Sequence, residues 1–188
     1  MHLLALGVNH HSAPVEVRER LAVPHPRLGE GLTALAQYLD SGVLLSTCNR
    51  TEVYAMAQRP GHARERIAQF LTQWSDLPRF LVNTLLYSYE QREAVKHIFR
   101  VACGLDSMIY GEAQILGQVR HALETAQAQG LTTPPLVRLF RAAVRVGRRV
   151  RSDTEIGRHA ASVSSASVEL AQKLLGGLPS RNLVVVGA

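Results

Sequence analysis

The chain has 188 residues, 46% of them hydrophobic, and no apolar run reaches the roughly 18 residues that a membrane-spanning helix needs. Its 21 Lys and Arg against 15 Asp and Glu give a net charge of +6, which favours an anionic partner, although such an excess can also serve solubility alone. Two cysteines exclude a disulfide framework, and the N-terminus has no signal-peptide pattern, so we expect a globular, cytoplasmic protein.

The first ninety residues alternate between strand and helix patterns. The predicted elements, in chain order, are a strand over His2–Val8, helices over Pro14–Leu21 and 26–40, strands over Val43–Thr47 and Glu52–Ala57, a helix over His62–Trp74 and a strand within 81–89. Strand, helix, strand, strand, helix, strand is the split βαβ order of a ferredoxin-like sheet. We therefore predict an α+β fold.

The chain then changes to consecutive helices, which predicts a helical subdomain after the sheet. The predicted helices cover 90–105, 112–130, 134–157 and Ala161–Leu175. The last residues, NLVVVGA, have the pattern of a buried parallel strand that precedes a glycine-rich phosphate-binding turn, of which only Gly187 is present. We expect a first domain over 1–156, a connecting helix and linker over 157–180, and the first strand of a truncated Rossmann domain over 181–188.

A cysteine stands at the tip of the predicted hairpin, in the sequence STCNR. Cys48 has two interpretations: a small hydrophobic residue that fills the core, or a nucleophile. In an extended segment, Arg50 would point to the same side as Cys48, where a guanidinium would lower the thiol pKa and bind a substrate carboxylate. Cys103 lies among apolar helical neighbours and is expected in the core.

Among the eight histidines, His97 lies on a helix whose apolar residues continue into the segment GLDSMIYGEAQILGQV. It is a candidate acid or base, or alternatively a packing histidine. No cluster of His, Cys, Asp or Glu has metal-ligand spacing, so we predict no metal.

The GLDSMIYGEAQILGQV segment places short polar side chains beside glycines, which lets a ligand approach the backbone closely. An alternative is helix capping by Asp106 or Ser107. The polar candidates for substrate binding are Ser107, Glu112, Gln114 and Gln118.

An arginine-rich stripe follows the helix predicted over 134–157. At 100° per residue, five arginines lie on one arc, opposite an apolar arc. The arginines are Arg138, Arg141, Arg145, Arg148 and Arg149, and the apolar residues are Leu136, Phe140, Ala143, Val144 and Gly147. The stripe is either a solvated face or a surface that follows phosphates.

Taken together, these motifs resemble the glutamyl-tRNA reductase family. The resemblance runs through LLALGVNHHSAPVEVRERL, LSTCNRTEVY, HIFRVACGLDSMIYGEAQILGQV, GRRVRSDTEIG and ASVSSASVELA in the family's order. It departs at Ala113 and Ala161, where other residues are usual. It implies an N-terminal catalytic domain that is followed in the family by an NADPH-binding domain and a helical dimerisation domain.

The resemblance also implies roles for single residues. Cys48 would displace tRNA from glutamyl-tRNA(Glu) as an enzyme thioester, and His97 would belong to the active site. Arg50 and Ser107 would contact the substrate, and Thr47 and Asn49 would complete the pocket walls.

For the whole family, the resemblance implies an NADPH-dependent oxidoreductase. It would reduce the thioester to glutamate-1-semialdehyde, the first step of tetrapyrrole (5-aminolevulinate, porphyrin and haem) biosynthesis, as a homodimer with an aminomutase as possible downstream partner. Taken as a 188-residue molecule, the chain has alternative functions as a glutamyl-tRNA esterase or as a non-catalytic tRNA-binding module. A third interpretation is an inactive fragment.

Overall fold

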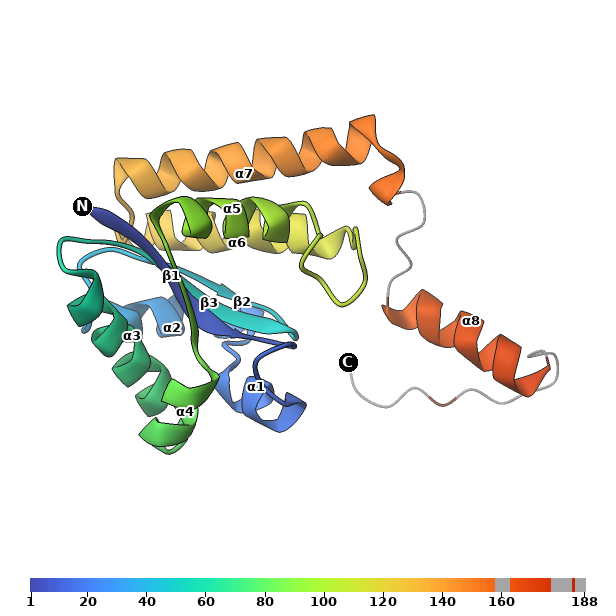
Figure 1. Cartoon of the computed structure of the whole chain (residues 1–188), viewed down its shortest axis with the longest axis horizontal. Coiled ribbons are helices and arrows are strands. Elements are labelled where there is room, and N and C mark those ends of the chain that lie inside the picture. The colour runs from blue at the N-terminus through green and yellow to red at the C-terminus, as the bar shows by residue number, and fades with distance from the viewer. Residues whose placement is uncertain (158–162, 177–183, 185–188) are drawn as a thin grey trace.

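The computed structural model describes residues 1–157, 163–176 and 184. A four-stranded sheet lies between two layers of helices, with α1 to α4 on one face and α5 to α7 on the other (Figure 1).

The sheet is antiparallel throughout. It consists of β1 (His2–Asn9), β2 (Val43–Ser46), β3 (Arg50–Ala57) and β4 (Tyr87–Glu90), in the order β2-β3-β1-β4. This order confirms the predicted α+β fold and its ferredoxin-like sheet. Because β1 and β3 lie at the centre, their side chains are covered on both faces, whereas β2 is an edge strand.

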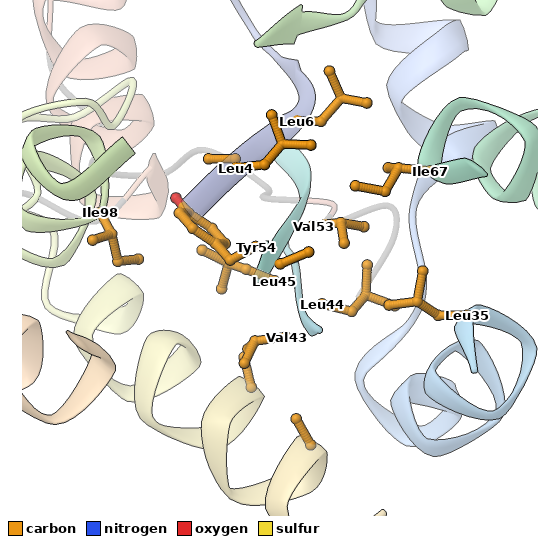
Figure 2. Close-up of a cluster of buried hydrophobic side chains, with 14 of the residues drawn as sticks. Leu4, Leu6, Leu35, Val43, Leu44, Leu45, Val53, Tyr54, Ile67 and Ile98 are labelled. Atoms are coloured by element: carbon orange, nitrogen blue, oxygen red, sulfur yellow. The ribbon is translucent and has the colours of Figure 1, made fainter. Parts of the chain in front are cut away.

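The first helical layer comprises α1 (Val15–Leu21), the short 3-10 helix η1 (His25–Arg27), α2 (Leu28–Leu35), α3 (Pro60–Ser75) and α4 (Arg79–Leu85). Figure 2 shows Leu44 and Val53 directed toward Leu35 of α2 and Ile67 of α3. On the other face of the sheet, Tyr54 is directed toward Ile98.

The second layer comprises α5 (Gln91–Ala102), α6 (Gln114–Ala128) and α7 (Pro134–Asp153). The predicted apolar arc of α7 is confirmed, since all five of its residues are buried. A Cβ at Gly147 would come within 2.6 Å of the Ala102 carbonyl oxygen, so this glycine allows α7 to pack closely on α5.

The strand predicted within 81–89 is confirmed as β4, which begins at Tyr87, but helix α4, which follows Pro78, was not predicted. Two other local predictions were wrong. The helix predicted over 26–40 is shorter, because tight turns follow Leu35. Residues 47–50 form a turn instead of extended chain, since the Thr47 amide donates to the Arg50 carbonyl at 2.8 Å.

The last described helix is α8 (Val163–Leu175). The start of the helix predicted over Ala161–Leu175 lies outside the described residues. So does the strand predicted over 181–188, with Gly187, apart from Val184. Within the described ranges, no helix is long and apolar enough to cross a membrane.

A glycine in β1 controls how closely the central strands meet. Gly7 pairs with Glu52 of β3 on one side and with Tyr87 of β4 on the other. A Cβ at Gly7 would lie 2.3 Å from the Thr51 carbonyl oxygen and 2.7 Å from the Glu52 Cα, and both are backbone atoms that cannot rotate away.

We therefore expect Gly7→Ala to lower the free energy of unfolding by about 1–3 kcal/mol or more, measured by urea denaturation. The matched control is Gly117→Ala in α6, where a Cβ meets nothing within 4 Å and should stabilise the helix by about 0.5–1 kcal/mol. Equal effects of the two substitutions would contradict the close approach at Gly7.

Candidate active site

The turn between β2 and β3 presents Cys48 at its tip, where the residue is exposed. The hydroxyl oxygen of Thr47 accepts hydrogen bonds from the backbone amides of Asn49 and Arg50, at 3.1 and 3.2 Å. The turn thereby directs Arg50 into the interior and leaves the thiol at the surface. The expectation that Cys48 and Arg50 share one extended face was therefore wrong.

A buried carboxylate, Glu52, lies at the centre of a polar cluster between the sheet and α5. Its side chain is fully buried and accepts four hydrogen bonds. The donors are Arg50 Nη1 at 2.7 Å, the Tyr54 hydroxyl at 2.6 Å, His97 Nε2 at 3.0 Å and the Tyr87 hydroxyl. An ionised carboxylate has about four acceptor sites, so this cluster saturates Glu52.

The cluster keeps Glu52 ionised. Burial alone would raise the pKa of Glu52, but the charge of Arg50 and the hydrogen bond from His97 outweigh it and hold the pKa well below its usual range. Burial likewise opposes the charge of Arg50, yet the facing Glu52 carboxylate raises the guanidinium pKa further above its usual value. Because an ionised carboxylate only accepts hydrogen bonds, His97 carries a proton on Nε2.

Two arginines hold the irregular segment between α5 and α6. Arg50 donates to the Asp106 carboxylate at 3.0 Å and also to the Asp106 carbonyl oxygen. At the far end of the segment, Arg151 of α7 donates to the Glu112 carbonyl oxygen at 2.8 Å. Asp106 thus binds Arg50 in place of the helix-capping role considered from the sequence.

The thiol of Cys48 is not activated by Arg50. Partial burial raises its pKa first, and the nearby Glu112 carboxylate raises it further, while Arg18 of α1 works in the opposite direction. Cys103 is buried, which confirms its predicted place in the core.

A cavity of about 240 Å³ opens beside the hairpin tip. Of the predicted site residues, Thr47, Cys48 and Gln118 line it, whereas Gln114, the first residue of α6, is exposed. Ser107 is buried and Asn49 is half-buried. The structure thus brings Thr47, Cys48 and Gln118 together at the cavity, and it brings Arg50 and His97 together around Glu52.

A second hollow, of about 320 Å³, lies between α6 and α7. Four arginines line it: Arg120, Arg141, Arg145 and Arg148. Arg120 lies 3.6 Å from Glu124, whereas the other three have no ion pair among the described residues. This arginine groove combines three arginines of the predicted stripe with Arg120 of α6, and such a cluster of positive charge suits phosphates.

Sequence reasoning missed Glu52, Tyr54 and Tyr87 as parts of the site. The signal was available in β3, where strand alternation places Arg50, Glu52 and Tyr54 on one face. An arginine and a glutamate two residues apart in a central strand indicate a buried ion pair. Within the described ranges, no group of three or more His, Cys, Asp or Glu is arranged to hold a metal.

Comparisons with known proteins agree on one family. The model of the glutamyl-tRNAGlu reductase N-terminal domain matches residues 6–154. Glutamyl-tRNA reductase of Bacillus velezensis is 43% identical over 100% of this chain and 42% of its own length, and glutamyl-tRNA reductase 2 of Koribacter versatilis is 45% identical over 100% and 43%. The chain thus spans less than half the length of these relatives.

A solved structure gives the same result. Glutamyl-tRNA reductase from Methanopyrus kandleri matches with a TM-score of 0.68 and 35% sequence identity. The match covers 91% of this chain and 39% of that one.

The Glu52 cluster makes a prediction about stability. Glu52→Gln leaves a buried guanidinium without its main counter-charge, so the free energy of unfolding at pH 7 should fall by about 3–5 kcal/mol. The pKa of Glu52 is lower in the folded state than its usual value of 4.5, so its contribution is complete above pH 4.5 and declines as the pH falls. The difference between wild type and variant in urea denaturation should therefore shrink at pH 3.5.

The matched control is Glu93→Gln, which breaks the exposed pair between Glu93 and Lys96 and should cost less than about 1 kcal/mol. A loss at Glu52 as small as the loss at Glu93 would show that the buried pair is not important for stability.

Proposed function

The chain belongs to the family of glutamyl-tRNA reductase N-terminal domains, and from this premise we propose that it accepts the glutamyl group of glutamyl-tRNA(Glu) on Cys48. The observation that carries the proposal is the position of this thiol: exposed at a turn, at the rim of a cavity, and two residues before Arg50 of the Glu52 cluster. The named relatives support this function over a simple esterase or a non-catalytic tRNA-binding module.

The proposed step is an acyl transfer. The sulfur of Cys48 attacks the carbonyl carbon of the glutamyl ester, a carbon–sulfur bond forms, and the bond to the ribose oxygen breaks. The thiol proton leaves with that oxygen, which becomes a hydroxyl of the released tRNA. Because the pKa of Cys48 is raised in the free protein, little thiolate is present before the substrate binds.

Arg50 is proposed to bind a carboxylate of the substrate. Its guanidinium is almost fully buried and already holds the Asp106 carboxylate at 3.0 Å. The substrate carboxylate would therefore replace Asp106, whose segment has neither helix nor strand between α5 and α6. His97 would act by donating to Glu52 and so fixing Arg50, and Ser107, Asn49, Glu112 and Gln114 are proposed to complete the substrate site.

Reduction of the thioester to glutamate-1-semialdehyde, the entry to tetrapyrrole biosynthesis, is proposed for the whole enzyme. NADPH would supply the hydride for that step. The described residues form an antiparallel sheet without a glycine-rich nucleotide-binding turn, and the proposed Gly187 contact lies outside them. The described residues therefore fit the acyl transfer and not the cofactor.

For the partners, we propose that the arginine groove binds phosphates of the tRNA. Its arginines lie on α6 and α7, and α6 also lines the cavity beside Cys48, so both features share one helix. For the whole enzyme, we also propose a homodimer, an aminomutase as downstream partner and a reducing, cytoplasmic location. A reducing compartment would keep both cysteines free, as they are here.

Acid-quenched incubation with glutamyl-tRNA labelled on the glutamate, without NADPH, tests the acyl transfer. We expect label on the protein that is released by hydroxylamine, because a thioester reacts with this nucleophile. Cys48→Ser should abolish the thioester label, whereas Cys103→Ser, which changes a buried cysteine, should retain it. Thioester label that persists in Cys48→Ser would contradict the proposal. An absence of label from wild type whose Cys48 thiol is shown to be free would also contradict it.

The arginine groove makes a separate prediction for tRNA affinity. Replacing Arg145 and Arg148 with Gln removes two phosphate contacts, so the slope of log affinity against log salt should fall by about 2. Fluorescence anisotropy with uncharged tRNA measures this slope. The matched control replaces Arg64 and Arg79, two exposed arginines on α3 and α4, with Gln, which removes the same charge from the other helical layer. Equal changes in both double variants would show a net-charge effect without a defined groove.

A further inference from the structure

The cavity beside Cys48 has an uncharged, partly aromatic lining. It lies at the open edge of β2, between the segment 22–28 and helix α6. Its lining residues are Ala22, Val23, Pro24, His25, Leu28, Ser46, Thr47, Cys48, Gln118, His121 and Ala122, and none of these is Lys, Arg, Asp or Glu. A carboxylate placed here would be buried without a counter-charge, so the cavity is unsuited to the glutamyl side chain.

Two imidazole rings close this edge of the fold. His25 and His121 are stacked, with ring centroids 3.9 Å apart and an interplanar angle of 16°. Burial and the neighbouring His25 both lower the pKa of His121, which favours the neutral form of this ring. Stacked rings form a flat surface on which another planar ring can lie.

A single unsatisfied polar atom also lies at this cavity. The side-chain carbonyl oxygen of Gln118 is buried and has no hydrogen-bond partner. A glutamine amide pairs with adenine through two hydrogen bonds, one accepted from the exocyclic amine and one donated to a ring nitrogen. An orphaned acceptor beside stacked rings therefore matches a purine that carries an amine.

We propose that this cavity binds the terminal adenosine of the tRNA, with the base stacked on the histidine pair of His25 and His121 and paired with Gln118. The inference rests on the proposed function, since the ester that Cys48 attacks is formed with the ribose of that nucleoside. Cys48 then lies between two subsites. The cavity binds the leaving nucleoside, and Arg50 binds the glutamyl group. The volume of about 240 Å³ is below the usual range of about 300–1,000 Å³ for ligand pockets, which suits one base rather than two.

The test compares two uncharged RNA minihelices that differ only in the last nucleotide, which carries adenine in one and no base in the other. By fluorescence anisotropy, wild type should bind the adenine-ended RNA about tenfold or more tightly. The double variant His25→Ala/His121→Ala should lose most of this preference, because only the pairing with Gln118 remains. Its affinity for the RNA without the base should be unchanged, which also shows that the variant is folded.

The matched control is His62→Ala, which removes an exposed imidazole from the separate cavity between 38–41 and 56–63. It should keep the full preference for adenine. Equal binding of the two RNAs by wild type, or an undiminished preference in the double variant, would overturn the adenosine subsite.

Glutamate benzyl thioester, which lacks a nucleoside, separates the two proposals. If it transfers its glutamyl group to Cys48 while wild type shows no preference for adenine, the subsite is wrong and the acyl transfer stands. If wild type prefers adenine but Cys48 accepts no glutamyl group from either donor, the subsite stands and the acyl transfer is wrong.

Discussion

The ion pair between Arg50 and Glu52 is the interaction on which the arrangement of the site depends. Both side chains are almost fully removed from water, at 1% and 0% exposure. Moving each of these charges from water into the protein interior costs several kcal/mol. This cost is offset by their mutual attraction only because hydrogen bonds also satisfy the remaining donors and acceptors. Through those bonds the pair joins β3 to β4, to α5 and to the segment that contains Asp106. Cys48 lies two residues before Arg50, in the turn that leads into this cluster.

The separation of Cys48 from Arg50 has a local cause. A turn closed by the Thr47 hydroxyl sends the Arg50 side chain inward and leaves the Cys48 thiol outside. The thiol is consequently not activated in the free protein, since burial and Glu112 both raise its pKa. If Cys48 is the nucleophile, as we propose, its reactivity depends on the arrival of the substrate.

The sequence predicted the sheet, its topology and the buried face of α7, because these depend on periodicity that is local in the chain. It also located Cys48 at a hairpin tip. The inward direction of Arg50 was missed although the alternation of β3 carried the signal, because the turn before this strand depends on two hydrogen bonds to the Thr47 hydroxyl. The cluster around Glu52 brings together residues up to 56 positions apart, and only the fold makes them neighbours. For the same reason, no local pattern indicated that His25 and His121 would stack.

The ionisation of Glu52 is the most direct test of this account, and carboxyl carbon NMR of selectively labelled protein measures it. If Arg50, His97 and the two tyrosines stabilise the carboxylate as described, the Glu52 signal should remain that of an ionised group until the protein unfolds in acid. A signal that titrates in the folded protein at or above pH 4.5 would contradict the account. Burial would then outweigh the ion pair, and the site would lack the charged centre that holds its parts together.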